Sequence, residues 1–381
     1  RGRGAAYSMR FMHTARRKAI ALTLALGLAL AASLGYVVGG LHAYGQYQQT
    51  YNAYATTCNT LLAWNPPTVL FTGFYPNMPA LLTLRYRSPS SQPQTLRVSV
   101  SIPGFTQEES VEQEADVAFR QQAFKPPLLS AAVLDALVGP RQRDAQIVVR
   151  IESLGAQGKL LCDTSAPILL KSRQWMRWYD PVTGDNSPYL AGWVTPQADV
   201  ISELVGQAAQ RLTQHPDLYG ATPALYGYDE GLASPAAVRA QVNAIFDTLQ
   251  FGDHLRYAND NIPYAQDATQ IIQLPKDVLT SAAPTGMCVE TTAILASAVE
   301  RLGMRPYIVI TRVHAYLGVA LGAQANAPMA YWETSDLNSG AAGDSANFHG
   351  DLEYNADQRA GHVLKVIDVQ AERQQGIEPM E

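Results

Sequence analysis

The stretch that decides the fold covers residues 284–322, PTGMCVETTAILASAVERLGMRPYIVITRVHAYLGVALG, and resumes at residues 330–337 as AYWETSDL. Apolar residues recur with helical spacing after Cys288, and Gly303 is a natural C-terminal stop, so a helix is predicted to begin at Cys288. The apolar run at residues 307–310 predicts a buried strand. Alternating residues at 313–319 predict a second strand, and residues 330–333 predict a third.

Three side chains on these predicted elements form a candidate catalytic set. Cys288 lies in the first turn of its helix, where unpaired N–H groups and the helix dipole favour a thiolate and can hold an oxyanion. His314 lies on a strand that would return beside this helix and is the candidate base. Glu333 is the candidate acid that orients the imidazole, and Asp336 is the second choice for that role.

The order of a cysteine before a helix, a histidine on a strand and an acid on the next strand resembles the transglutaminase-like superfamily, relatives of papain-type cysteine enzymes. The resemblance covers residues 235–337, with IIQLPKDVL at residues 271–279 similar to the family's approach to its cysteine. It implies that Cys288 is the nucleophile, His314 the base and Glu333 the acid. It also implies that Gln273 helps to polarise the oxyanion.

Two departures from the family pattern loosen any inference about substrate. Glu333 stands where Asp is commoner, and Val289 follows the cysteine where many catalytic members carry Trp or Asp. A single cysteine or histidine of this kind is more often a structural residue, so the ordered set of three carries the assignment. Other members with this arrangement serve as binding or scaffold domains, because a fold does not fix a function.

The N-terminal region predicts a membrane anchor. Its six cations all precede residue 19, whereas the 381-residue chain as a whole has 28 Lys and Arg against 33 Asp and Glu. Residues 19–41 carry no charge and have the length of a bilayer span, which predicts a transmembrane helix over residues 19–43. The basic arm at residues 1–18 would then be cytoplasmic. A signal peptide cleaved near residues 29–31 is the alternative.

We therefore expect a single-pass protein of the inner membrane whose soluble domains are periplasmic. Residues 44–66 are predicted to form a helical stalk with tyrosines along one face. An aromatic belt that docks onto the chain's own soluble domain is favoured for these tyrosines, and packing on a partner helix in the membrane interface is the alternative. The acidic remainder of the chain argues against nucleic acid as a partner, because phosphate binding needs clustered cations.

The predicted fold class is α+β, with the transmembrane helix followed by a β-sandwich-like domain at residues 67–172 and a transglutaminase-like domain at residues 173–381. Short alternating runs separated by turns indicate the sandwich, and residues 110–137 are expected to hold a short helix. Helices are predicted at residues 198–212 and 235–252, and a polar surface loop or flap at residues 338–351.

The other cysteines and the histidines are considered as disulfide partners and as metal ligands. Cys58 and Cys162 flank the predicted sandwich and either form a disulfide or remain two buried thiols. His215, His254, His349 and His362 lie apart in the sequence, and no zinc site, calcium loop or cofactor motif is predicted. A solvated loop is favoured over a calcium site for residues 253–267.

Two functions follow from these observations. The first is a membrane-anchored extracytoplasmic cysteine enzyme that attacks an amide or isopeptide bond of a peptide or protein through Cys288, His314 and Glu333. The second is a non-catalytic subunit of a membrane complex that uses the same fold for binding. A buried Cys288 and a filled cleft would favour the second function.

Overall fold

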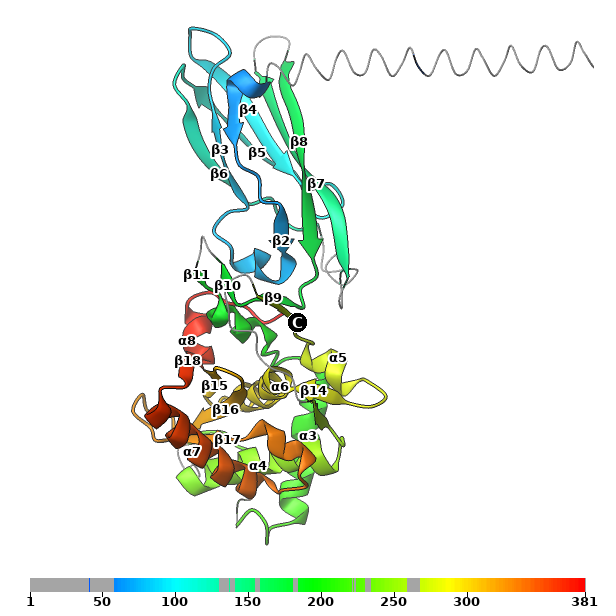
Figure 1. Cartoon of the computed structure of the whole chain (residues 1–381), viewed down its shortest axis with the longest axis vertical. Helices are drawn as coiled ribbons and strands as arrows, with labels where there is room; N and C mark the ends of the chain where they lie inside the picture. The colour runs from blue at the N-terminus through cyan, green and yellow to red at the C-terminus, as the bar shows by residue number, and fades with distance from the viewer. Residues whose placement is uncertain are drawn as a thin grey trace, which may run out of the picture.

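The computed structural model describes residues 41, 58–129, 137, 141–154, 158–180, 184–220, 222, 224–229, 234–258 and 268–380. Figure 1 shows two units along the long axis of the molecule, a β unit followed by a mixed unit of helices and strands. Each unit has its own large hydrophobic core.

The β unit contains a five-stranded sheet, ordered β2-β8-β7-β4-β5, and a three-stranded sheet, ordered β1-β3-β6. Its strands are β1 (Leu62–Trp64), β2 (Val69–Phe71), β3 (Leu82–Tyr86), β4 (Gln94–Ser101), β5 (Glu109–Ala115), β6 (Arg120–Phe124), β7 (Gln142–Ser153) and β8 (Lys159–Lys171). All named pairs in this unit are antiparallel except β2 with β8, which is parallel.

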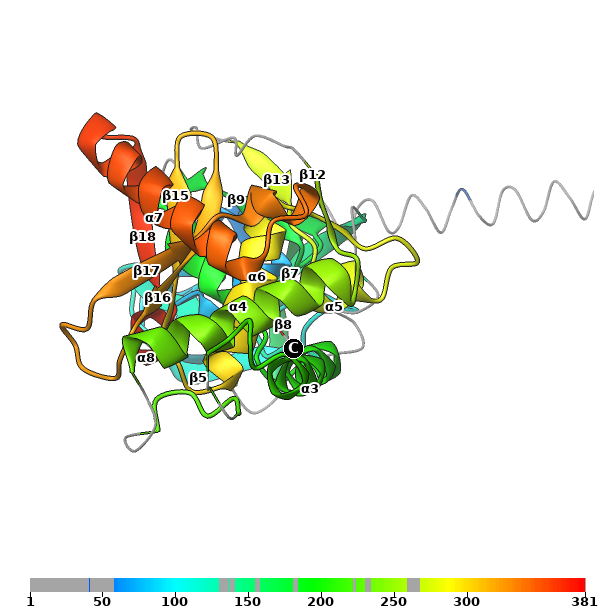
Figure 2. The same ribbon diagram turned by 90° about the horizontal axis from the view of Figure 1, so that it is seen from below.

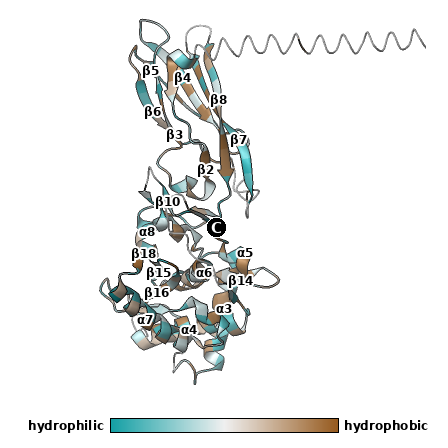
Figure 3. Ribbon diagram, in the orientation of Figure 1, coloured by the Kyte–Doolittle hydropathy of each residue, from teal (hydrophilic) through white to brown (hydrophobic). Residues whose placement is uncertain are grey.

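The two sheets bury facing side chains between them, as expected for a sandwich. Leu96 and Val98 of β4 are fully buried, and they belong to the same core as Leu84 and Phe124 of the smaller sheet. Figure 3 shows that the hydropathy differs between two paired strands of the larger sheet. The start of β7 is polar, whereas the end of β8, with which it pairs, is apolar.

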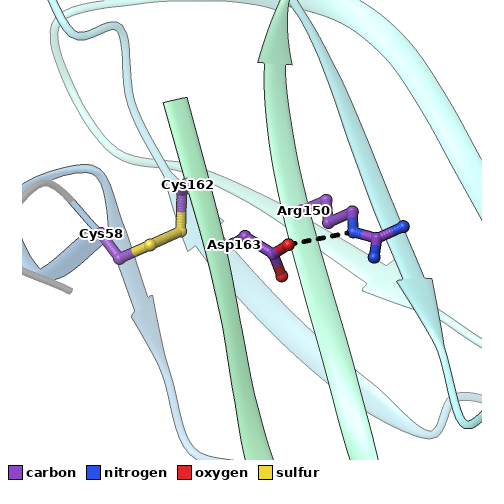
Figure 4. Close-up of a disulfide and its surroundings, with 4 residues drawn as sticks. All are labelled: Cys58, Arg150, Cys162 and Asp163. Carbon is purple, nitrogen blue, oxygen red and sulfur yellow. Dashed lines mark hydrogen bonds and ion pairs between the residues drawn. A yellow bond between two sulfur atoms is a disulfide. The ribbon is translucent and has the colours of Figure 1, made fainter. Parts of the chain in front are cut away.

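A disulfide between Cys58 and Cys162 joins the start of the described β unit to β8. Figure 4 shows it close to Arg150 and Asp163, an ion pair between neighbouring strands. The sequence left the pairing of these two cysteines open, and the structure has them bonded. The third cysteine, Cys288, is free and buried.

The short helix expected within residues 110–137 is wrong for residues 110–124, which lie largely in β5 and β6. In β5 the half-buried residues alternate with exposed ones, ending at the fully buried Ala115. The hydrophobic pattern did not indicate this strand, because β5 has few apolar residues and glutamates occupy exposed positions.

The mixed unit contains the following elements: β9 (Trp175–Arg177), β10 (Tyr179–Asp180), β11 (Gly184–Asp185), α3 (Asp199–Gln214), α4 (Pro235–Phe251), β12 (Arg256–Ala258), β13 (Thr269–Ile271), α5 (Pro275–Leu279), β14 (Thr285–Met287), α6 (Cys288–Arg301), β15 (Pro306–Thr311), β16 (Ala315–Ala320), β17 (Met329–Trp332), α7 (Gly343–Ala360), β18 (Val363–Asp368) and α8 (Val369–Gln374). The described residues also form short 3-10 helices, which are η1 (Thr72–Asn77) directly after β2, and η2 (Ser187–Trp193) and η3 (Thr334–Asn338) in the mixed unit.

The centre of this unit is an antiparallel sheet ordered β17-β16-β15-β18. Residues such as Ile308 and Leu317 join the core that contains α6, whereas Val309 and Tyr316 form a second cluster with Tyr354 of α7. The sheet therefore has α6 on one face and α7 on the other. Figure 2 views α4, α6 and α7 from below.

The polar loop expected at residues 338–351 is a second correction, because α7 begins at Gly343. A Cβ atom at Gly343 would lie 2.7 Å from Cα of Asn243, and one at Gly350 would lie 2.5 Å from the carbonyl carbon of Tyr331. These glycines let α7 approach α4 and β17 closely. Their frequency in the sequence therefore reflects tight packing rather than a flexible loop.

The transmembrane helix in the predicted fold class is also corrected. In the portion of the chain that the structure describes, no helix has the length and apolar character needed to span a bilayer. The longest of these helices is α7, and it contains charged residues such as Asp351 and Arg359. The predicted span at residues 19–43 lies outside the described residues except for Leu41, as do the basic arm and most of the stalk. The α+β class holds for the described residues.

Candidate active site

Cys288 is the first residue of α6, directly after β14. The carboxylate of Glu290, 1% exposed, fixes this junction by accepting hydrogen bonds from the backbone N–H of Met287 at 2.8 Å and of Gln273 at 2.7 Å. It therefore closes a capping box and ties the approach segment to the first turn of α6. The first backbone N–H groups of α6 have no carbonyl partner within the helix.

His314 ends the turn between β15 and β16. The turn is closed by Thr311, whose backbone N–H donates to the carbonyl of His314 at 2.9 Å. The Thr311 hydroxyl accepts from the backbone N–H of His314 at 3.1 Å. These bonds hold the histidine at one end of the sheet, with 17% of its side chain exposed.

Glu333 follows β17 and caps η3, with its side chain accepting from the N–H of Ser335 at 2.9 Å. Strands β16 and β17 are neighbours, and the hydroxyl of Thr334 donates to the carbonyl of Ala315 at 3.2 Å. This pairing brings the acid next to the base. Oε1 of Glu333 lies 2.6 Å from Nε2 of His314.

His314 and Glu333 each stabilise the charged form of the other. Burial alone would lower the pKa of His314, but its hydrogen bonds to Cys288 and Glu333, together with the charges of both groups, raise this pKa to about 10. Burial would raise the pKa of Glu333, but the hydrogen bond to His314 and its charge hold the pKa below its ordinary value. His314 is therefore an imidazolium at neutral pH.

The imidazole of His314 thus interacts with both Cys288 and Glu333. Glu333 bonds Nε2, so Nδ1 is the ring nitrogen that faces the other partners of the imidazole. The hydrogen bond between Cys288 and His314 contributes to the raised pKa of the histidine. Residue Cys288 is completely buried.

Asp336, the second choice for the acid, is not part of this set. Its carboxylate lies 2.7 Å from Nδ1 of His349, whose side chain is half exposed on α7. Gln273 lies beside α6 through its backbone bond to Glu290, and its side chain is half-buried.

The remaining histidines that the structure describes do not gather into a site. His362 pairs with Asp357 at 3.4 Å, and His254 occupies a left-handed backbone conformation with φ of 53°. Across the residues that the structure describes, no group of three or more His, Cys, Asp or Glu side chains is arranged to hold a metal ion. Asp253 is half-buried, while residues 260 and 267 of the same segment lie outside the described part.

Two residues at the site were missed by reasoning from the sequence. The hydroxyl of Tyr257 lies 3.4 Å from Nδ1 of His314, and the two rings meet edge to face. Asn338 hydrogen-bonds the backbone of Tyr257. Neither residue carries a signal in the sequence, because Tyr257 lies far before the cysteine and Asn338 was assigned to a loop.

Comparison of the chain with protein-family models and with curated proteins finds no match.

Proposed function

We propose that this protein is a cysteine enzyme of the transglutaminase-like type that attacks amide or isopeptide carbonyls of a peptide or protein. The observation that carries this proposal is the position of His314, which is bonded to Glu333 at 2.6 Å through Nε2 and interacts with Cys288. A nucleophile, a base and a group that orients the base are the parts that covalent acyl transfer requires.

The charge state of the site suggests how the reaction begins. An imidazolium at His314 stabilises a thiolate at Cys288, which attacks the carbonyl carbon without a separate deprotonation step. The imidazolium then gives its Nδ1 proton to the departing amine as the tetrahedral intermediate collapses to a thioester. Glu333 keeps the ring oriented and stabilises its positive charge throughout.

The oxyanion that forms in this step needs hydrogen-bond donors. The N–H groups in the first turn of α6 are suited to this role, since helix N-termini favour negative charge. The side-chain amide of Gln273 is a further donor, in line with the family resemblance. The backbone bond from Gln273 to Glu290 keeps this residue next to the first turn of α6.

The disulfide between Cys58 and Cys162 supports an extracytoplasmic setting. Structural disulfides form and persist in oxidising compartments, whereas thiols in the cytosol are kept reduced. We therefore expect the enzyme to act on substrates outside the cytoplasm.

The complete burial of Cys288 favours a second candidate function. A thiol that no reagent can reach has no catalytic use, and a buried Cys288 with a buried Glu333 also suits a rigid binding domain. In that case the protein would be a non-catalytic subunit of a larger complex, and the polar set would specify the packing of α6 against the sheet.

Alkylation of the intact protein by iodoacetamide distinguishes these functions. The chain has three cysteines and two of them are disulfide-bonded, so carbamidomethylation without reductant reports on Cys288 alone. An enzyme should react rapidly at pH 6 to 7. The His314→Ala variant should react appreciably only near pH 8.5, the ordinary range for a free thiol.

The His349→Ala variant is the matched control, because His349 also pairs with a carboxylate but lies on α7. It should retain the reactivity of the wild type. If Cys288 reacts only after the protein is unfolded in urea, the enzyme proposal is wrong and the binding function is favoured.

A further inference from the structure

Tyr257 lies outside the predicted catalytic set, and its hydroxyl contacts the imidazole of His314. It lies in β12, which runs parallel to β14 with Tyr257 opposite Gly286 and Ala258 opposite Met287. The strand that carries Tyr257 is thus hydrogen-bonded to the strand that leads into Cys288. The Tyr257 hydroxyl lies 3.4 Å from Nδ1 of His314, with the ring centroids 6.1 Å apart.

Asn338 fixes the backbone of Tyr257. Its side-chain Oδ1 accepts the N–H of Tyr257 at 2.9 Å, and its Nδ2 donates to the carbonyl of the same residue at 2.6 Å. The amide therefore takes the place of a neighbouring strand along the edge of β12. Asn338 ends η3, the short helix that Glu333 caps, so one five-residue element links the acid to the placement of Tyr257.

The Tyr257 hydroxyl contacts Nδ1 of His314, the nitrogen that must donate and accept protons during the reaction. Nε2 is bonded to Glu333, so Nδ1 exchanges protons with the leaving group and with the nucleophile that resolves the thioester. That nucleophile must come within about 2.6 to 3.2 Å of Nδ1. A hydroxyl 3.4 Å from the same nitrogen is close enough to share one bound water or amine with it.

We propose that Tyr257 is a further catalytic residue, whose hydroxyl hydrogen-bonds the water or amine that attacks the thioester while Nδ1 of His314 removes that nucleophile's proton. A phenol both donates and accepts hydrogen bonds, so it suits either nucleophile. This inference rests on the proposed function.

The step balances within the site. After acylation His314 has given up its Nδ1 proton and is neutral. The nucleophile forms a bond to the acyl carbon as its proton moves to Nδ1, and the carbon–sulfur bond then breaks. Sγ of Cys288 leaves as a thiolate beside the restored imidazolium, so no outside oxidant or reductant is needed.

The test uses p-nitrophenyl acetate, which acylates an active cysteine and releases a coloured phenolate. The burst of phenolate measures acylation, and the steady rate measures resolution of the acetyl thioester. The Tyr257→Phe variant keeps the ring but lacks the hydroxyl. Its burst should stay within about twofold of wild type while its steady rate falls about tenfold, the scale expected for loss of one hydrogen bond in a transition state.

Two further variants sharpen the result. Asn338→Ala should lower the steady rate in the same direction, because it releases the backbone of Tyr257. Tyr354→Phe is the matched control, since the Tyr354 hydroxyl accepts from Gln358 on α7 at 2.7 Å. Tyr354→Phe should leave both phases at the wild-type value.

Two outcomes would overturn the inference alone. These are a wild-type steady rate in Tyr257→Phe, or an equal loss of burst and steady rate, which would indicate a structural role. If wild-type protein shows no burst and mass spectrometry finds no acetyl group on Cys288, the proposed function fails as well. The wild-type burst therefore separates failure of the function from failure of the role of Tyr257.

Discussion

Nε2 of His314 lies 2.6 Å from Oε1 of Glu333, although the two residues come from different turns at one end of the central sheet. The pairing of β16 with β17 creates this contact, with Leu317 opposite Trp332 in the register. The contact selects Glu333 over Asp336 as the acid, since Asp336 is paired with His349. The interaction of His314 with Cys288 and this contact with Glu333 together raise the pKa of the histidine.

Removing the Glu333 charge should reduce the reactivity of Cys288. In the Glu333→Gln variant the pKa of His314 should fall from about 10 towards its ordinary 6.5, because the hydrogen-bonded negative charge is lost. Less imidazolium is then present beside the thiol, and alkylation by iodoacetamide at pH 7.5 should slow about tenfold. The Asp336→Asn variant should react at the wild-type rate. Equal slowing in both variants would contradict the assignment of the acid.

The pair should also make stability depend on pH. The pKa of His314 is raised on folding, so its contribution is fully present below the unfolded value of 6.5 and is lost as the pH rises through about 10. The pKa of Glu333 is lowered, so its contribution is present above 4.5 and is lost as the pH falls through the folded value. A double-mutant cycle in urea, using His314→Gln and Glu333→Gln, should give a coupling free energy of about 2 kcal/mol at pH 5.5 to 6. A coupling that stays unchanged at pH 10.5 would argue against a charged pair.

The disulfide should stabilise the β unit without affecting the candidate active site. Cys58 and Cys162 are 104 residues apart, and a loop of this size corresponds to about 4.7 kcal/mol in the chain-entropy model. The Cys58→Ala and Cys162→Ala double variant should lose free energy of unfolding on this scale in urea titrations of the β-sheet signal. Cys288 belongs to the core of the other unit, so its alkylation rate in native buffer should not change. A large change in that rate would show that the two units are coupled.

Gly350 should be intolerant of a side chain. An added Cβ would lie 2.5 Å from the backbone carbonyl of Tyr331 and 2.7 Å from the N of Trp332, so α7 would have to move away from β17. We expect Gly350→Ala to lower the free energy of unfolding by about 2 kcal/mol, within the range known for overpacking. Gly206→Ala is the control, because nothing lies within 4 Å of a Cβ there and α3 should gain about 0.5 to 1 kcal/mol. Thermal unfolding would measure both, and a neutral Gly350→Ala would contradict the close contact.

Much of the mixed unit was predictable from local patterns. The helices at α3, α4 and α6 begin within one residue of their predicted starts, because apolar spacing, a first-turn proline and a terminal glycine act locally. Ser234 caps α4 through a bond from the N–H of Ala237 at 3.1 Å, directly before that proline. The strands β15, β16 and β17 overlap the predicted runs at residues 307–310, 313–319 and 330–333, and each extends beyond its run by one residue at one or both ends.

The errors arose where packing outweighed local composition. Residues 343–351 are rich in glycine and polar residues, yet they form the first half of α7 because Gly343 and Gly350 fit closely against α4 and β17. Strand β5 has little apolar character and is stabilised by pairing with β4. The N-terminal span has no counterpart among the described helices.

The sequence by itself determined a helix that begins at Cys288 and strands directly beside His314 and Glu333, because hydrophobic periodicity and turn residues specify elements one at a time. Only the tertiary structure decided that Glu333 rather than Asp336 bonds His314, that Cys288 is fully buried, and that Asn338 holds Tyr257 against Nδ1. These contacts join residues far apart in the chain. Their geometry depends on strand register and on how closely helices approach the sheet, and neither is encoded in a local pattern.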